Sequence, residues 1–369
     1  MSEEKIRPAA DTQMRKDDQQ SIERPWFFVG LLPSGVSSKE SSESPVSFRP
    51  ALDKIAIGWV DYVTGAEFDK EALAAAVQVG FSAGLVSALL QQSPNSYQDN
   101  DSELGIRLPS VQVRGLEVEA PPLLILIRKN VVCTIHPHSV DRRFSQLRRY
   151  GDTILKKIPA DTPDTGKLSM LVARIIDHNS DRNFEHLRQI EAQGDNLNAI
   201  LMDPNAPRVK LGTEIYRLKH AILVYLDALW STVDVIDTIR YGDAELISDD
   251  PKLLDKFRTL GEDVNRQMGL AEHMSEVLSS GLQVLQTIHN NELQNLNNRL
   301  ALLMTYLTII GTAVLVPNTL ATILGNSVFS IGPEGLGWYL ALMIGSTVVA
   351  TLLVYLWVRK LGWIPKKMD

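Results

Sequence analysis

The sequence predicts a water-soluble α/β domain that is followed by a long helix and a C-terminal hairpin of two transmembrane helices. Three observations predict this architecture. β-rich and helix-forming segments alternate before residue 138, apolar residues recur every three or four positions between residues 257 and 300, and residues 300–333 and 335–358 contain no charged side chain. An uncharged apolar segment of about 20 residues spans a bilayer as an α-helix. We therefore expect a membrane protein with a large water-soluble part.

The composition excludes several other classes of protein. With 369 residues, of which 44% are hydrophobic and 22% charged, the chain is able to bury a sizeable core. Its 37 Lys and Arg against 44 Asp and Glu give a net charge of −7, so it lacks the basic excess of a nucleic-acid binder. The single cysteine, Cys133, excludes an intrachain disulfide and a zinc site built from cysteines. We expect a buried, inert thiol.

The N-terminal part of the chain is predicted to be a polar tail and then a mixed α/β domain. Residues 1–24 are charged, have no apolar period and contain no apolar segment typical of a secretory signal peptide, so we expect disorder. An α/β domain follows over residues 25–138. We expect strands at 25–30, 54–63, 108–120 and 121–137, a helix at 70–92, and a Ser-rich loop at 33–47.

Residues 139–250 are predicted to be a helical region. β-Branched alternation becomes rare there, and helix-forming residues dominate. Turn residues at Pro163–Gly166 and Asp203–Pro207 separate the segments. The helical segments are 144–158, 167–202 and 213–239.

The next segment is predicted to be one long helix. Pro251 occupies a typical first helical position, and no further proline occurs until Pro317. The apolar period predicts a helix of about 70 residues, roughly 100 Å long, with a stalk over 251–299 that continues into the bilayer. The alternative is two helices broken at Gly261, Gly269 or Gly281.

The hairpin is expected to cross the cell (inner) membrane twice, with both termini in the cytoplasm. Transmembrane helix 1 is predicted at 300–325, an outer loop at 326–336, and transmembrane helix 2 at 337–358. A basic tail follows at 359–369. Arginines and lysines lie just before the first span and just after the second. By the positive-inside rule, these two ends face the cytoplasm.

The first span carries a polar stripe. At about 100° per residue, Thr305, Thr308, Thr312, Thr319 and Asn326 fall within a sector about 60° wide. Such a stripe is typical of a pore or a polar helix interface, although threonines also occur in ordinary packed spans. One span cannot enclose a channel, so a pore requires several copies of the chain around an axis. The alternative is a hairpin that serves only as an anchor.

Four motifs and their order resemble one family, the CorA-type divalent metal ion transporters. WVDY at 59–62 and RKNVVCTIHPH at 128–138 resemble two of its strands, and YLTIIGTAVLVPNT at 306–319 resembles its first span. Gly332-Pro333-Glu334, followed by Trp338, resembles its outer loop. The resemblance implies a pentameric membrane protein with an α/β cytoplasmic domain, a helical stalk and two transmembrane helices.

The resemblance also implies a function. It points to a passive homopentameric channel or transporter for divalent cations, with Mg²⁺ as the first candidate ion and Co²⁺ or Zn²⁺ as others. The family's Gly-Met-Asn signature is absent, and Leu324-Gly325-Asn326 stands near its place, so a zinc or broad-cation transporter is an alternative. A non-conducting membrane-anchored sensor or scaffold is another.

The expected partners are other copies of the chain and membrane lipid. Since GxxxxGK[ST] and GxGxxG are absent, we expect no nucleotide. We also expect no cofactor beyond the transported or regulatory cation, no nucleic acid and, since no catalytic constellation is evident, no enzymatic activity.

The candidate site residues belong mainly to the first span. Asn326 and Gly325 could form a ring of amide and carbonyl oxygens suited to hydrated Mg²⁺, although a helix C-cap is the alternative. Threonine hydroxyls of this span could hydrogen-bond to the water shell of the ion, and its apolar side chains could close the pore by dewetting. For each of these residues, ordinary helix packing is the alternative. These pore candidates are Thr319, Thr312 and Thr308, and the gate candidates are Met304, Leu307 and Leu315.

Further candidates lie outside the span. Glu334 would form a ring of negative charge at the outer mouth, or else be a solvated loop carboxylate. Glu262 and Asp263 are regulatory metal ligands by the resemblance, and a solvated helix face is the alternative. His136 and His138 are a candidate zinc pair, against ordinary histidines at a strand end.

Overall fold

The computed structural model describes residues 24–91, 96–115, 117–201, 208–241, 244–325 and 335–360. It divides into two compact units, Met1–Leu282 and Gln283–Asp369, which are described separately below.

A seven-stranded mixed sheet forms the centre of the first unit. Its strand order is β2-β1-β3-β9-β8-β5-β4, and only β3 and β9 pair in parallel. A small hairpin, β6–β7, stands apart from it. The strands are β1 (Trp26–Leu31), β2 (Ser37–Ser42), β3 (Ile57–Thr64), β4 (Ser96–Asp99), β5 (Glu103–Pro109), β6 (Gln112–Arg114), β7 (Glu117–Glu119), β8 (Pro122–Arg128) and β9 (Val131–Pro137).

Two helices, α3 (Phe68–Val79) and α4 (Ala83–Gln91), cover one face of this sheet. The chain turns between them at Gly80, whose φ of +108° is a conformation that side chains with a Cβ rarely adopt. Gly105 of β5 lets α4 lie close to the sheet, since a Cβ there would come 2.4 Å from a methyl group of Leu89. Alternate residues of β1, β3, β8 and β9 complete this apolar core, as the period of two in a strand requires.

Three helices, α5 (Asp141–Arg149), α6 (Gly151–Lys156) and α7 (Asp164–Ser180), follow the last strand and a 3₁₀ turn, η1 (His138–Val140). They cover the other face, where Phe27, Trp59 and Phe144 are buried. The strands therefore carry apolar residues on both faces, as in sheets that are covered on both sides.

The structure corrects four details of the sequence prediction. The Ser-rich segment 33–47 is not only a loop, because it contains the edge strand β2, whose backbone pairs with β1 while its side chains stay largely exposed. Such a strand needs no apolar pattern. The predicted helix at 70–92 is two helices, and strands β4 and β5 were not predicted. A short helix, α2 (Arg49–Leu52), also lies between β2 and β3.

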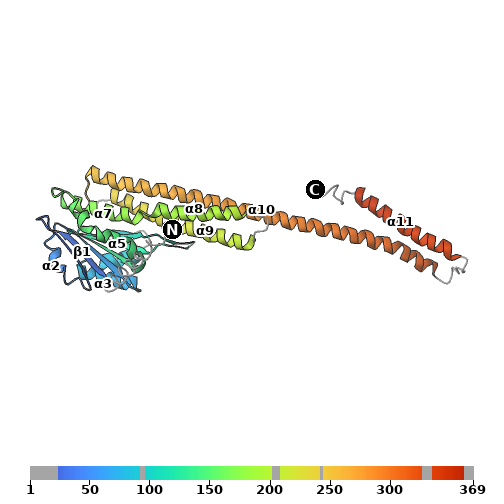
Figure 1. Cartoon of the computed structure of the whole chain (residues 1–369), viewed down its shortest axis with the longest axis horizontal. Helices are drawn as coiled ribbons and strands as arrows, with labels where there is room; N and C mark the ends of the chain where they lie inside the picture. The colour runs from blue at the N-terminus through green and yellow to red at the C-terminus, as the bar shows by residue number, and fades with distance from the viewer. Residues whose placement is uncertain are drawn as a thin grey trace, which may run out of the picture. The chain divides into compact units, whose positions relative to one another are not determined.

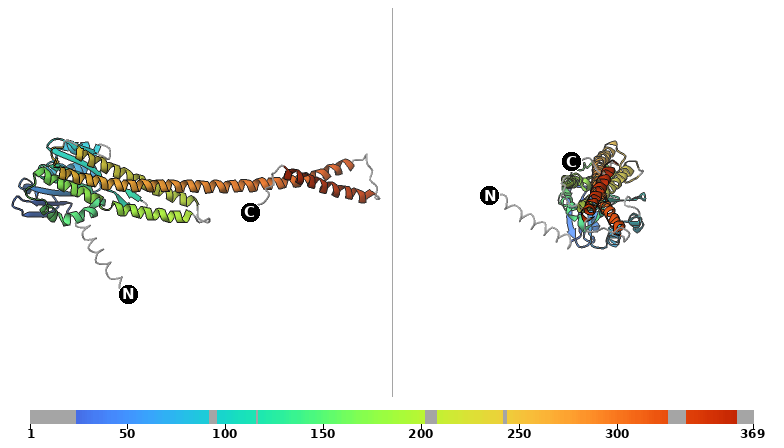
Figure 2. Two further views of the ribbon diagram at one scale, coloured as in Figure 1. Left: turned by 90° about the horizontal axis from the view of Figure 1, so that it is seen from above. Right: turned by 90° about the vertical axis from the view of Figure 1, so that its right-hand side faces the viewer.

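Long helices run side by side in the rest of this unit (Figures 1 and 2). They are α8 (Asn183–Leu201), α9 (Arg208–Tyr241) and the first part of α10 (Pro251–Leu324). Buried polar contacts connect all three. The side-chain amide of Asn183 donates to Oε1 of Gln267 at 3.0 Å, and the hydroxyl of Tyr225 donates to the backbone oxygen of Asn183 at 3.0 Å.

Helix α10 has 74 residues and is continuous, so the alternative of two helices broken at a glycine is wrong. Asp250 caps its start, since Oδ1 accepts a hydrogen bond from the backbone N–H of Lys252 at 3.0 Å and Pro251 fills the first position. Gly261, Gly269 and Gly281 all lie within the helix. A single glycine costs a helix only about 1 kcal/mol.

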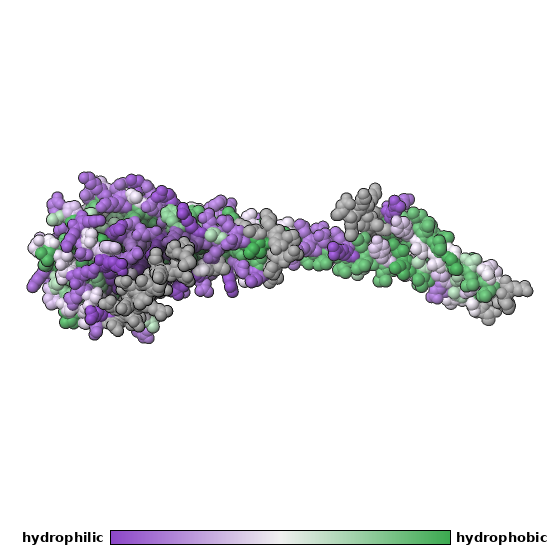
Figure 3. Space-filling model, viewed as in Figure 1, coloured by the Kyte–Doolittle hydropathy of each residue, from purple (hydrophilic) through white to green (hydrophobic). Residues whose placement is uncertain are grey.

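The second unit contains the end of α10 and α11 (Leu336–Lys360). Both helices are long and apolar enough to cross a membrane, and only 11% of the most apolar window of each is buried. Figure 3 shows a largely hydrophobic surface on these two helices. Ile309, Ala313 and Val358 are the hydrophobic residues buried among the described residues of this unit.

Candidate functional site

Two of the motifs that carried the family resemblance meet inside the sheet. Strands β3 and β9 are parallel neighbours, so Asp61 of WVDY pairs with Thr134 of RKNVVCTIHPH. The indole N–H of Trp59 donates to the hydroxyl of Thr134 at 2.9 Å, and that hydroxyl donates to Asp61. The ring of His136 lies 3.3 Å from the Asp61 carboxylate, and the guanidinium of Arg148 in α5 lies 3.4 Å from the same carboxylate.

This cluster is buried and fully paired. Asp61 is 0% exposed. Burial alone would raise its pKa, but the charge and hydrogen bond of His136, the charge of Arg148 and the hydrogen bond of Thr134 outweigh burial and lower the pKa. Such a network fixes strand register and ties α5 to the sheet. We therefore assign it a structural role.

The histidine pair does not converge on a ligand position. His136 is buried beside Asp61 and stacks on the ring of Phe144. The strand ends at Pro137, so the alternation of sides stops, and His138 is exposed in the 3₁₀ turn. The interpretation as ordinary histidines at a strand end fits this geometry. The prediction for Cys133 is confirmed: it is buried and free, and burial, followed by the charge of Asp61, raises its thiol pKa.

The two apolar helices lie side by side, and α11 covers only one face of α10 (Figure 1). Ile309 and Ala313 mark that face, with exposed fractions of 8% and 7%. Met304 and Leu315 point to the roughly opposite side of the helix and are 70% and 65% exposed. Most of the surface of α10 in this unit is thus open in a single chain.

The predicted polar stripe lies on the flank between these two faces. Thr308 and Thr319 are exposed, and Thr312 is half-buried. Each hydroxyl donates its proton at 2.8 Å to the carbonyl four residues earlier, those of Met304, Thr308 and Leu315. The donor of each threonine is therefore used within the helix, while its oxygen keeps an outward-facing acceptor position.

The remaining pore candidates are Leu307, directly before Thr308, and the residues at and beyond the end of α10. Leu307 is 71% exposed. Gly325 directly follows the helix, and its N–H donates to the carbonyl of Ala321 at 2.8 Å. A Cβ at Gly325 would come 2.9 Å from that same oxygen, so the backbone favours glycine there. Asn326 and Glu334 lie outside the described residues, and their roles stay predictions.

The two regulatory candidates lie on α10 in the first unit, and arginines of the same helix pair with them. Arg258 bonds to Glu262 at 2.6 Å and to Asp255 at 2.6 Å, and Arg266 pairs with Asp263. The described residues contain no group of three or more His, Cys, Asp or Glu able to hold a metal ion. A metal at Glu262 and Asp263 would require ligands from elsewhere, and this role stays a prediction.

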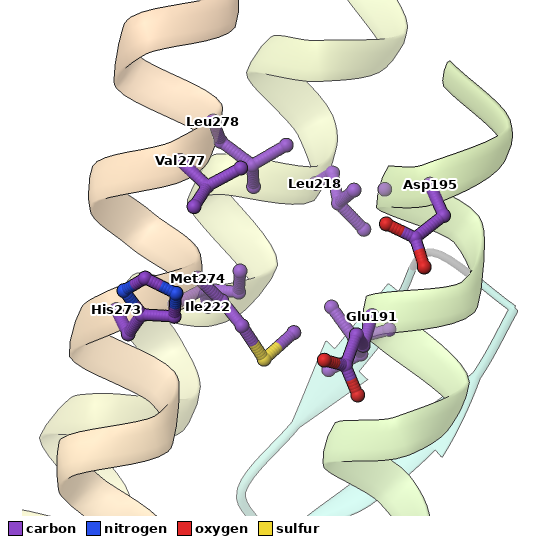
Figure 4. Close-up of a pocket in the computed structure, with 10 residues that line it drawn as sticks. Glu191, Asp195, Leu218, Ile222, His273, Met274, Val277 and Leu278 are labelled. Atoms are coloured by element: carbon purple, nitrogen blue, oxygen red, sulfur yellow. The ribbon is translucent and has the colours of Figure 1, made fainter. Parts of the chain in front are cut away.

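A cavity of about 160 Å³ lies among α8, α9 and α10 (Figure 4). Glu191 and Asp195 of α8 lie on one side and His273 of α10 on the other, and the wall between them is apolar. Its three ionisable side chains do not form a metal-ligating group in the described part of the chain.

Two long, exposed apolar helices beside a large α/β and helical unit are typical of an integral membrane protein. The chain belongs to the family described as CorA-like Mg²⁺ transporter protein, whose model matches residues 56–360. The resemblance found in the motifs is thereby confirmed, and the family is one of divalent cation transporters. No curated protein matches the chain in sequence.

Solved structures show the same fold. The chain is similar to the complete CorA magnesium transporter from Methanocaldococcus jannaschii, with 18% identity, a TM-score of 0.63, and coverage of 92% of this chain and 98% of that one. It is also similar to the full-length CmaX protein, with 18% identity, a TM-score of 0.57, and coverage of 91% and 98%. The soluble domain of the M. jannaschii CorA matches 71% of this chain and 96% of its own length, with 17% identity and a TM-score of 0.55.

One feature of the first unit has no counterpart in the sequence patterns. Arg114, Arg142, Arg143 and Arg182 come from segments far apart in the sequence, yet all line one cavity. No motif joins them in the sequence. Only Arg142 and Arg143 are neighbours in the chain, and such a pair alone does not predict a site.

Proposed function

We propose that the chain forms a homopentameric, passive channel for hydrated divalent cations, with Mg²⁺ as the preferred ion. Membership in a family of cation transporters supports the class of function. The observation that carries the proposal is the open side of α10, where exposed apolar residues border a stripe of threonine oxygens.

The chemistry of this stripe suits a cation that keeps its water shell. Mg²⁺ gives up its water reluctantly, and the water molecules around it direct their hydrogens outward. Since each threonine donates its own proton to the helix, its oxygen is free to accept a hydrogen bond from such a water. Met304, Leu307 and Leu315 are the apolar residues beside the stripe, and rings of them would close the path by dewetting.

Self-association is supported by the apolar period of α10. The residues that pack in the first unit recur every seven positions, at Phe257, Val264, Ala271 and Leu278. Further along the helix, Leu293, Leu296 and Leu300 are 46%, 54% and 55% exposed. A second copy of the helix is the natural cover for these side chains.

The ion filter is assigned in the same proposal to Gly325 and Asn326, with Glu334 attracting cations at the outer mouth. Backbone carbonyls and side-chain amides are hard oxygen ligands. The protein is assigned to the cell (inner) membrane, with both termini on the cytoplasmic side. Arg359, Lys360 and the other cationic residues after the second span support this orientation.

Ion flux into liposomes that contain the purified protein tests this proposal. We expect Mg²⁺ uptake down its gradient, with weaker competition by Co²⁺ and Zn²⁺. Preferred uptake of Zn²⁺ would instead favour the zinc or broad-cation alternative. If no divalent cation crosses, the non-conducting sensor becomes the better account.

A matched pair of variants tests the threonine stripe. Replacing Thr308, Thr312 and Thr319 together by valine keeps the side-chain shape and removes three acceptors worth about 1 kcal/mol each, so we expect a loss of flux of about tenfold or more. The control replaces Thr347 and Thr351 of α11 by valine. Their hydroxyls make the same bond to the carbonyl four residues earlier, at 2.7 Å, and we expect unchanged flux.

A further inference from the structure

A polar cavity of about 250 Å³ lies in the first unit, where the β6–β7 hairpin, the start of α5 and the start of α8 meet. Among the described residues that line it, none is acidic and none is a phenylalanine, tyrosine or tryptophan. Four arginines and one histidine face it: Arg114, Arg142, Arg143, Arg182 and His186.

Arg143 is the buried cation of this cavity. It is 9% exposed, and neutral oxygens hold its guanidinium in place. Nη2 donates to the backbone oxygen of Val111 at 2.6 Å, and Nη1 donates to Asn179 and to the hydroxyl of Ser110. Burial lowers its pKa to about 10, and Asp181 opposes this shift. Arg143 makes no ion pair with a carboxylate in the described part of the chain.

The rim adds positive charge that the protein leaves available. Arg114 and Arg182 are exposed, and neither forms a side-chain hydrogen bond or ion pair with another described residue. His186 lines the same wall, and its buried Nδ1 has no hydrogen-bond partner. Burial, and then the charges of Arg143 and Arg182, lower the pKa of His186 to about 4 against the opposing effect of Glu185.

The walls of the cavity are connected to one another. The side-chain amide of Gln112 in β6 donates to the backbone oxygen of Ser139 in the 3₁₀ turn at 2.5 Å. The side-chain amide of Gln193 in α8 donates to the backbone oxygen of Gly115 at 3.2 Å. These contacts hold three separate segments of the chain around the arginines.

We propose that this cavity binds a phosphate group, either inorganic phosphate or a small phosphomonoester. Guanidinium groups match phosphate oxygens with paired N–H donors, and several of them neutralise its double charge. The volume lies below the roughly 300–1,000 Å³ of pockets for drug-sized ligands, which favours a compact anion. The proposal goes beyond cation transport and does not depend on it.

Isothermal titration calorimetry on the full-length protein in detergent tests the proposal, in Mg²⁺-free buffer at constant ionic strength. We expect saturable binding of sodium phosphate or of glycerol phosphate, and no saturable binding of chloride. Absence of saturable binding for both phosphates would overturn the proposal, and so would acetate that binds as tightly as phosphate.

Variants at the rim identify the site without disturbing the buried Arg143. Arg114→Gln and Arg182→Gln should each weaken phosphate binding by about tenfold or more, since each removes a charged hydrogen-bond donor. Arg188→Gln is the matched control, because Arg188 is exposed on helix α8, which begins directly after Arg182, but does not line the cavity. Unchanged affinity in both rim variants, with an unchanged melting temperature in the absence of phosphate, would overturn the assignment of the site.

Discussion

The two units of the chain differ in how far their apolar side chains are buried. The first unit buries them within itself, on both faces of a sheet and between long helices. The second unit leaves most of them exposed, although it contains the continuation of the same helix α10. The first unit therefore covers most of its apolar residues itself, whereas those of the second unit stay open to the lipid and the further copies of the chain that we propose as their cover.

Assembly is where this comparison predicts the largest effect. Replacing Leu293, Leu296 and Leu300 together by glutamine removes the exposed apolar stripe without touching the first unit. We expect loss of the oligomer, measured by mass photometry in detergent. The control replaces Val277 by glutamine as well. Val277 belongs to the first unit and is 40% exposed, so this change should leave assembly intact. A pentamer that survives the triple substitution would contradict a role for this stripe.

A smaller effect is expected from the buried carboxylate of the first unit. Asp61→Asn removes the buried carboxylate that faces Arg148 at 3.4 Å and His136 at 3.3 Å, so that Arg148 keeps only its ion pair with Asp141. Breaking this buried pair should lower the free energy of unfolding by about 3–5 kcal/mol. The matched control is Asp263→Asn, which breaks an exposed pair with Arg266 and should cost about 0–1 kcal/mol. Pulse proteolysis of the full-length protein in urea measures both. Equal costs would contradict the contrast between buried and exposed pairs.

The pKa of Asp61 gives a pH dependence. Because its folded-state pKa lies below the unfolded value of about 3.9, the carboxylate stabilises the fold above that value. This stabilisation is lost as the pH falls below about 4 toward the folded-state pKa. Asp61→Asn should flatten the acid limb of a stability-against-pH curve in that window. An acid limb identical in the variant and the wild type would assign the loss to other groups.

The smallest effect concerns the outer mouth of the proposed pore. An exposed ring of Glu334 attracts cations only over a Debye length, about 8 Å at physiological salt. Glu334→Gln should therefore lower Mg²⁺ flux a few-fold at low ionic strength and little at high ionic strength. An equal loss at all salt concentrations would indicate a structural role for this residue.

The regular elements were predictable where a period was strong. The apolar period after Pro251 predicted α10, and Asp250 explains its start. The length of the two uncharged segments, 300–333 and 335–358, predicted the two apolar helices. Strand β2 was not predictable in this way, because an edge strand is held by backbone bonds and its Ser-rich side chains remain exposed.

The candidate site was predictable only in part. Helical geometry sufficed to group Thr308, Thr312 and Thr319, but which face α11 covers depends on packing that the sequence does not show. Arg258 and Arg266 pair with the regulatory candidates Glu262 and Asp263, so these arginines compete with a metal ion for the two carboxylates. The residues are three or four positions apart on one helix, a spacing at which side chains are neighbours. The arginine cavity joins three distant segments, and no local pattern reveals such a site.

In the proposed pore, the face of α10 that α11 leaves open lines a water-filled path. Two neighbouring residues test it, Thr308, which is exposed, and Ile309, which is 8% exposed. Each is replaced by cysteine and treated with a charged, membrane-impermeant thiol reagent during Mg²⁺ flux. The native Cys133 is buried and should not react. We predict that reagent blocks flux through the Thr308→Cys protein and leaves the Ile309→Cys protein unaffected. Unmodified Thr308→Cys protein, or full flux after its modification, would mean that this face of α10 does not line the path.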